Sequence, residues 1–275
     1  MHRMTARRVS VHPLHPNLQE TFPEFCDALW QAWLNETIDA SPFVRDHFDL
    51  DAAPEPFLLF GTGAAPLVAL TTNPGEATMR EQHRKAVRAG ASPLRPTLDY
   101  TEAARALGDF YAEQLTGPAR RRIDNLRCLA QWAGYDGVLQ VEACPFHSRS
   151  LPKTAALRRE IEADSLLGRY AEHVRAFLRP RPVVIVAAVS SRQPLRAGME
   201  LPWWAAFQAN LAGMAPARAR FWPLVEKELV TTAGAWVSSE AGAPKALVLM
   251  MGGNRLPGER GLRVLADALR SADAP

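Results

Sequence analysis

The sequence predicts an α/β protein in which a central, mainly parallel four-stranded sheet forms the middle of a three-layer α/β/α arrangement. Four short apolar runs alternate with segments of helical periodicity, and each run ends in a turn-rich segment. This alternation is typical of a parallel sheet whose two faces are covered by helices. The four predicted strands are 67–70, 137–144, 183–189 and 246–251.

Two further segments have β character. Phe57–Phe60 is a short apolar run, and a glycine turn joins it to the strand at 67–70, so the two are predicted to be consecutive strands. Residues 219–239 are ambiguous, and a strand pair around Phe221 and Trp236 is one interpretation of them.

Apolar residues at helical spacing predict the helices between the strands. The first helix runs from Asn17, as its N-cap, to about residue 35, and Pro42 falls in the loop that follows. Pro118 suits the first turn of a later helix, because an N–H group there would have no partner within the helix. The pattern at 76–88 is only moderately helical. The other predicted helices are 101–115, 118–132, 154–162, 164–178, 203–211 and 261–270.

The chain of 275 residues fits a single domain, with an irregular N-terminal arm at 1–16 and an α/β core at 57–270. Hydrophobic residues make up 47% and charged residues 22%, as in ordinary soluble globular proteins. The formal net charge of +3 does not by itself indicate a nucleic-acid-binding protein. No apolar run is long enough to span a bilayer, and the basic N-terminus lacks the apolar core of a secretory signal. We therefore expect a cytoplasmic monomer without membrane contact.

The three cysteines, Cys26, Cys128 and Cys144, are far apart, and none belongs to a CxxC pair. This spacing supports neither a disulfide framework nor a zinc or iron–sulfur site. We expect no metal and no cofactor.

Polar side chains follow three of the predicted strands, at the point where each strand ends. If the strands are parallel, these ends share one edge of the sheet, where open α/β sheets bind their ligands. The sequence therefore predicts one cleft lined by all three groups. The candidates are Thr71, Thr72, Asn73 and Glu76 after the first strand, Glu142, Cys144, His147, Ser148 and Arg149 at and after the end of the second, and Asn254 and Arg255 after the last.

The segments that contain these residues resemble the motifs of the uracil-DNA glycosylase superfamily. Asn73–Gly75, the sequence Asn-Pro-Gly after a buried strand, is similar to its first motif, which in two branches reads Gly-x-Asn-Pro-Gly, although Thr71 stands at the leading glycine. Glu142–Pro145 resembles its second motif, Asn-x-Cys-Pro, with Glu142 in place of the asparagine that reads the base. The third motif would fall on 253–257, where Asn254 is present and the usual histidine is not. The resemblance spans roughly 57–260.

The resemblance implies that a target nucleotide leaves the DNA duplex and enters the cleft, where its glycosidic bond is hydrolysed. Asn73 would position the attacking water, since an amide can hydrogen-bond water but cannot act as a base. Glu76 would accept the proton of that water. Alternatively, Glu76 has only a structural role, as an acid that stabilises the first turn of a helix. Asn254 would donate a hydrogen bond in place of the missing histidine, and Thr72 would contact the base.

Glu142 is the largest departure from the family pattern. A carboxylate only accepts hydrogen bonds, so it would repel O4 of uracil and would bind an exocyclic amino group, as on cytosine or adenine. Two interpretations follow. Either the target base differs from uracil, or Glu142 pairs with an arginine such as Arg149 and reads no base.

The remaining candidates have assigned roles and structural alternatives. His147 would stabilise the departing base anion or contact a phosphate, or is an ordinary loop residue. Phe146 would stack on the flipped base, or belongs to the core. DNA contacts are assigned to Ser148, Arg149 and Arg255, and Leu256 would act as a wedge in the vacated base stack.

These assignments predict a DNA-base N-glycosylase-like enzyme whose partner is single- or double-stranded DNA. A non-catalytic nucleic-acid-binding protein on the same fold is the alternative, favoured by Glu142 and by the missing histidine. An unrelated α/β hydrolase or nucleotide-binding enzyme is a third option, although the chain contains no GxSxG, Walker or GxGxxG motif.

Overall fold

A computed structural model describes most of the N-terminal two thirds of the chain and selected segments beyond it. The predicted arm at 1–16 and the predicted helices at 76–88 and 203–211 lie outside the described residues. Those described are 20–61, 66–71, 99–114, 117–148, 154–178, 183–189, 220–226, 229–236, 245–251, 259, 262, 263, 266, 267 and 270.

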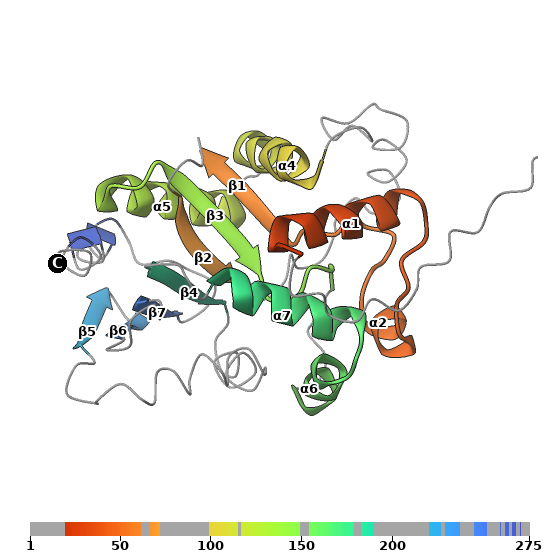
Figure 1. Cartoon of the computed structure of the whole chain (residues 1–275). Coiled ribbons are helices and arrows are strands. Elements are labelled where there is room, and N and C mark those ends of the chain that lie inside the picture. The colour runs from red at the N-terminus through yellow and green to blue at the C-terminus, as the bar shows by residue number, and fades with distance from the viewer. Residues whose placement is uncertain are drawn as a thin grey trace, which may run out of the picture.

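Within these residues, seven strands form one mixed sheet in the order β1-β3-β2-β4-β7-β6-β5. The four predicted strands are β2, β3, β4 and β7, and they lie side by side in parallel. The α/β class is thus confirmed, and β1, β3 and β2 form a three-stranded mixed part of this sheet that packs against helices (Figure 1). The strands are β1 (Phe57–Gly61), β2 (Leu67–Thr71), β3 (Gly137–Glu142), β4 (Val183–Val189), β5 (Arg220–Glu226), β6 (Leu229–Trp236) and β7 (Lys245–Met251).

The predicted number of four strands is wrong, because antiparallel strands extend the parallel sheet at both edges. β5 and β6 pair with one another and β6 pairs with β7, so the strand-pair interpretation of 219–239 is correct. At the other edge β1 pairs with β3 and not with β2, its neighbour in sequence. β3 lies between them, and Gly137 faces Gly61 so closely that a Cβ atom on Gly137 would come within 2.4 Å of the Phe60 carbonyl oxygen.

The described helices agree closely with the periodicity of the sequence, except at the start of the chain. The first helix begins at Phe22, and its N-cap is Thr21 instead of the predicted Asn17. Thr21 and Glu24 form a reciprocal capping box, which satisfies two of the free N–H groups at that end. The segment at Pro42, predicted as a loop, is a short helix capped by Ser41. The helices are α1 (Phe22–Leu34), α2 (Pro42–His47), α4 (Tyr100–Gln114), α5 (Gly117–Ala133), α6 (Thr154–Glu162) and α7 (Leu166–Leu178). Glu259, Leu262, Arg263, Ala266, Asp267 and Arg270 are also helical, in agreement with the predicted last helix.

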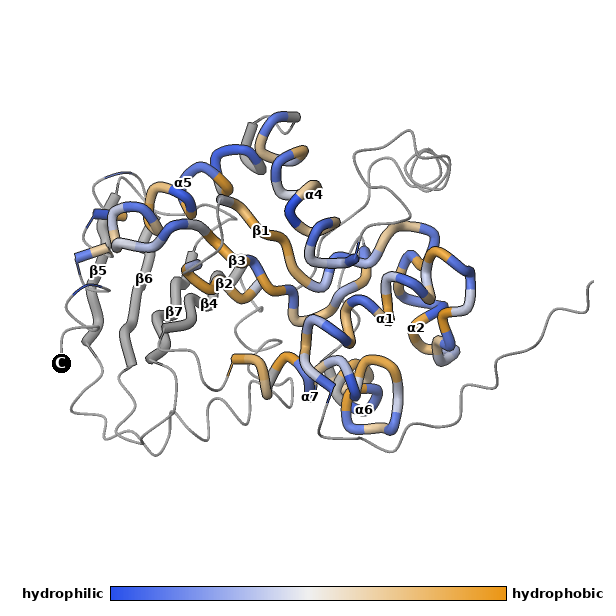
Figure 2. Tube along the Cα trace, turned by 45° about the horizontal axis from the view of Figure 1, so that its top comes forward, coloured by the Kyte–Doolittle hydropathy of each residue, from blue (hydrophilic) through white to orange (hydrophobic). Residues whose placement is uncertain are grey.

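Aromatic side chains join α1, α4 and α7 to the beginning of β1. The ring of Phe22 lies 5.8 Å from that of Phe57 and 5.9 Å from that of Tyr170. Tyr100 packs edge-on against Phe57 at 5.0 Å and donates a hydrogen bond to the Phe57 carbonyl oxygen. All residues of β2 and β3 are buried, and Figure 2 shows these strands and β1 as predominantly hydrophobic. The core therefore surrounds the region where β3 ends and β1 begins.

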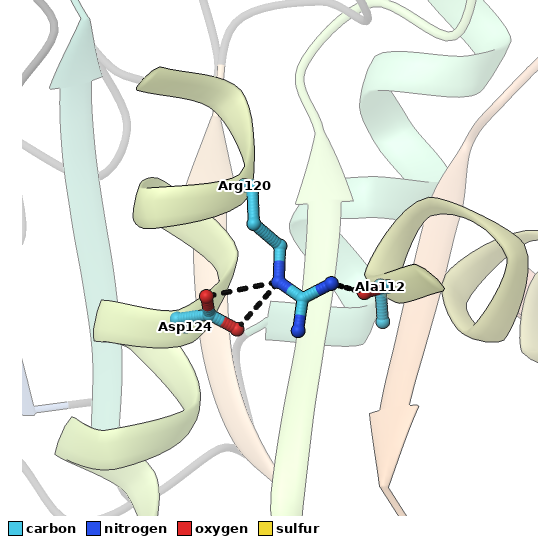
Figure 3. A network of polar contacts seen from close by, with 3 residues as sticks. All are labelled: Ala112, Arg120 and Asp124. Atoms are coloured by element: carbon cyan, nitrogen blue, oxygen red, sulfur yellow. Dashed lines mark hydrogen bonds and ion pairs between the residues drawn. The ribbon is translucent and has the colours of Figure 1, made fainter. Parts of the chain in front are cut away.

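Helices α4 and α5 are also linked to one another. Nε of Arg120 lies 2.9 Å from both carboxylate oxygens of Asp124 one turn along α5, and its guanidinium donates to the carbonyl oxygen of Ala112 on α4 (Figure 3). Both charged side chains are more than a third exposed, so the ion pair itself adds little stability. Gly134 closes α5 with a φ of +91°, a conformation that side chains disfavour.

No helix of the described residues is long and apolar enough to span a membrane.

Cysteine burial predicts that a thiol reagent modifies only Cys128 in the folded protein. Cys26 and Cys144 are buried, whereas Cys128 is partly exposed. Burial raises the pKa of the Cys144 thiol to about 12, and that of Cys26 well above its ordinary value. At pH 8 the reactive thiolate of Cys144 is therefore about 1,000-fold rarer than that of an ordinary cysteine. Labelling with dithiobis(nitrobenzoate), followed by mass spectrometry, tests this, and urea should expose all three thiols. Fast labelling of native Cys144 would contradict the expectation.

Candidate functional site

The predicted site depends on the carboxyl ends of β2 and β3 lying side by side. The two strands are parallel, and Thr71 and Glu142, the last residue of each, are partners in the register. The Thr71 hydroxyl donates to the carbonyl oxygen of Val141 at 3.3 Å, so Thr71 holds the two strand ends together. The parallel strands β4 and β7 have their carboxyl ends at the same edge of the sheet.

Seven of the predicted site residues lie outside the described part of the chain. Their roles stay predictions, although the strands that precede Asn73 and Asn254 are in place. The seven are Thr72, Asn73, Glu76, Arg149, Asn254, Arg255 and Leu256.

The loop after β3 is held by the segment that precedes β1. This segment runs antiparallel to the loop, as a continuation of the pairing of β1 with β3. The N–H of Glu142 donates to the Pro56 carbonyl at 2.9 Å, that of Glu55 to the Pro145 carbonyl at 2.8 Å, and that of Asp49 to the His147 carbonyl at 2.9 Å. Backbone hydrogen bonds on this pattern fix the position of residues 142–148 relative to 49–56.

The carboxylate of Glu55 and the imidazole of His147 form a buried side-chain pair at the centre of this contact. Nε2 of His147 lies 3.3 Å from Oε1 of Glu55, and the two residues are 6% and 3% exposed. The hydroxyl of Tyr111, on α4, donates to the same carboxylate oxygen. Three polar side chains from separate segments thus converge in the protein interior, where a charge requires such partners.

Glu142 is buried beside this contact and belongs to a second polar group. Nε2 of Gln140, two residues earlier on the same side of β3, donates to Oε1 of Glu142 at 2.6 Å. Tyr170 on α7 donates to the Glu142 carbonyl oxygen at 2.6 Å and so fixes the backbone there. Oε1 of Gln140 is buried and finds no hydrogen-bond partner among the described residues. The amide oxygen of Gln140 is therefore a buried acceptor close to the Glu142 carboxylate.

Burial keeps the two tyrosines of these groups, Tyr111 and Tyr170, in their neutral form. Burial is the main cause that raises the pKa of Tyr111 well above its ordinary value, and the nearby Glu55 carboxylate adds to it. Burial likewise raises the pKa of Tyr170, with smaller contributions from Cys26, Cys144 and Glu142. Both phenols are hydrogen-bond donors at neutral pH. The Cys144 thiol stays protonated for the reason given above and is not a nucleophile.

The other described candidates lie at the same loop. Phe146 is 1% exposed, and its ring lies 6.2 Å from that of Phe48. Its side chain therefore belongs to the core. Ser148 is 5% exposed. No group of three His, Cys, Asp or Glu residues in the described ranges could hold a metal ion.

Sequence reasoning missed Glu55, Tyr111 and Gln140. Glu55 stands between two prolines directly before a strand, and nothing in this sequence pattern indicates that its carboxylate is buried. Tyr111 belongs to the apolar side of a predicted helix, and its hydroxyl gives no sign of its partner. Gln140 is a polar residue in an otherwise apolar strand, a pattern that favours a specific hydrogen bond.

Comparison of the chain with protein-family models, with curated proteins and with solved structures gives no match.

Proposed function

We propose that this chain hydrolyses the N-glycosidic bond of a flipped, damaged base in DNA, on a three-layer α/β/α fold of the uracil-DNA glycosylase type. One observation carries the proposal. The Asn-Pro-Gly and Glu-Ala-Cys-Pro motifs follow or end parallel strands that are direct neighbours, with Thr71 opposite Glu142. The two motifs that carry the resemblance therefore start from the same place at the edge of the sheet.

The strand order supports a ligand at this edge. β2 has β3 on one side and β4 on the other, so the connections that leave β2 and β4 proceed toward opposite ends of the sheet. Open α/β sheets bind ligands at such a switch point, outside the carboxyl ends of the strands. Asn73, two residues after the end of β2, follows the strand that borders this point.

The proposed chemistry uses the roles that the resemblance implies. Asn73 orients a water molecule toward the anomeric carbon, and Glu76 takes the proton as the oxygen–carbon bond forms. The bond between sugar and base breaks with its electron pair on the base, and His147 stabilises the anion that departs. Glu142 contacts the edge of the base. Ser148, Arg149 and Arg255 bind DNA phosphates, and Leu256 fills the space that the flipped base leaves.

Incubation with oligonucleotides tests the activity. Single- and double-stranded substrates should contain uracil, hypoxanthine, a mismatch, or a damaged base that keeps an exocyclic amino group. Alkali then cleaves the strand wherever a base has been removed, and gel electrophoresis measures the product. Strand breaks that depend on the protein are the expected result.

Asn73→Ala is expected to lower the rate of base removal at least about 100-fold, because it removes the group that orients the water. Asn125→Ala, at a partly buried position of α5, is the matched control and should keep full activity. Salt-dependent DNA binding without strand breaks would indicate the non-catalytic nucleic-acid-binding protein instead. Neither binding nor breakage would leave the unrelated α/β enzyme.

A further inference from the structure

The pair of Glu55 and His147 has a geometry that general acid–base and electrostatic catalysts use. An imidazole whose one nitrogen donates to a buried carboxylate has a fixed orientation and a fixed proton. Here the carboxylate oxygen lies 3.3 Å from Nε2, and both side chains are almost completely buried. Since a carboxylate only accepts, the proton of this contact belongs to Nε2.

We infer that Glu55 is a positioning residue for His147: its carboxylate holds the imidazole in one orientation, with the proton on Nε2. The carboxylate is itself held in place. Tyr111 donates to Oε1 of Glu55, and the Glu55 backbone is hydrogen-bonded to Pro145, two residues before His147. The backbone N–H of Asp49 donates a hydrogen bond to the carbonyl oxygen of His147.

A purely structural link between the two segments would not require a buried carboxylate beside an imidazole. The backbone bonds of residues 49 and 55 already join the two segments, and a neutral side-chain pair of the same size could fill the space. Burying a charged carboxylate beside an imidazole costs desolvation energy that an apolar pair would avoid. The carboxylate adds one property that the backbone bonds lack, namely a fixed orientation and tautomer of the His147 imidazole.

In the proposed reaction a fixed imidazole needs no reorientation when negative charge develops on the departing base. The catalytic role of the pair rests on the proposed function, whereas the proton on Nε2 does not. The experiment therefore has one spectroscopic part and one kinetic part.

The spectroscopic part uses the full chain labelled with ¹⁵N in its seven histidines. His147→Gln identifies the His147 signals by their loss. We expect Nε2 of His147 to carry a proton that resonates downfield, as in a hydrogen bond to a carboxylate. Glu55→Gln should move this proton signal upfield, and Tyr111→Phe, which keeps the carboxylate, should retain it. The matched control is Glu160→Gln, because Glu160 accepts a hydrogen bond from Ser41 away from this contact, and it should change nothing.

The kinetic part measures kcat and KM for base removal. Glu55→Gln should lower kcat roughly tenfold or more and leave KM almost unchanged, as expected for a group that acts in the transition state. In the double variant with His147→Gln, Glu55→Gln should add no further loss, because Glu55 acts through that imidazole.

The outcomes separate the inference from the proposed function. A protein without base-removal activity whose His147 signal still depends on Glu55 would refute the glycosylase function and support the pairing. An active protein in which the two substitutions add independently, or in which Glu55→Gln leaves the signal in place, would overturn the inference alone. If Glu55→Gln fails to fold, the wild-type spectrum decides, since an Nε2 without a proton is incompatible with the pairing.

Discussion

Replacing Gly108 with alanine is expected to lower the free energy of unfolding by about 2–3 kcal/mol. Gly108 lies within α4, where the exchange of glycine for alanine would ordinarily stabilise the helix by about 1 kcal/mol. The sign is reversed here because a Cβ atom would come within 2.1 Å of the Leu59 carbonyl oxygen on β1. That oxygen belongs to the backbone of a paired strand, so α4 must move away from β1 as a whole.

Urea unfolding followed by circular dichroism measures this loss. Asp109→Ala, at the exposed position next to Gly108, provides the control and should change the free energy by less than about 0.5 kcal/mol. The displacement of α4 should also disturb the hydrogen bond from Tyr111 to Glu55, because Tyr111 lies one turn further along the helix. A Gly108→Ala protein as stable as the wild type would show that α4 and β1 are further apart than described.

The strands of the parallel sheet could be predicted because each is a local feature of the sequence. A run such as that of β2 or β3 is apolar over its whole length and ends in a turn, whatever lies beside it. The neighbours of a strand depend on contacts far along the chain. β1 and β2 are joined by a short segment, yet β3 lies between them, and no residue of β1 indicates this. Consecutive strands are neighbours often but not always.

The N-cap of α1 is a local feature of the sequence, but the prediction placed it at Asn17 instead of Thr21. Thr21 and Glu24 have the spacing of a capping box, and their hydrogen bonds define the first turn. Asn17 is also a good capping residue, and the apolar Leu18 extends the helical pattern toward it. Propensity alone does not choose between two caps, whereas the reciprocal pair does.

The candidate site was predictable where it depends on strand ends and unpredictable where it depends on the edge strand. Glu142 ends a recognisable strand and His147 follows it, so their place at the edge of the sheet could be expected. The partner of His147 comes from the segment before β1, which reaches the loop only because β1 runs antiparallel to β3. Glu55 thus becomes part of the site through a pairing that its own sequence does not encode.

Replacing Glu142 with asparagine is expected to change the preference between uracil and a base with an exocyclic amino group by about 1,000-fold. In the proposed site, the carboxylate of Glu142 would accept a hydrogen bond from an amino group and repel the O4 atom of uracil. An amide offers a donor to O4 and gives up part of the attraction to the amino group. A change of about 2 kcal/mol in each direction is about 30-fold for each base, and the two factors multiply.

The measurement is the ratio of kcat/KM for the two bases in the same oligonucleotide, for the wild type and for Glu142→Asn. Glu142→Gln is the second variant, because it keeps the length of the side chain and with it the hydrogen bond from Gln140. Glu160→Gln is again the control for a change of charge elsewhere. Thermal unfolding separates altered specificity from lost stability, since the carboxylate is buried and its removal also relieves a desolvation cost. If both Glu142 variants keep the wild-type ratio while removing either base, Glu142 does not contact the base, and its carboxylate has only the structural role of holding Gln140.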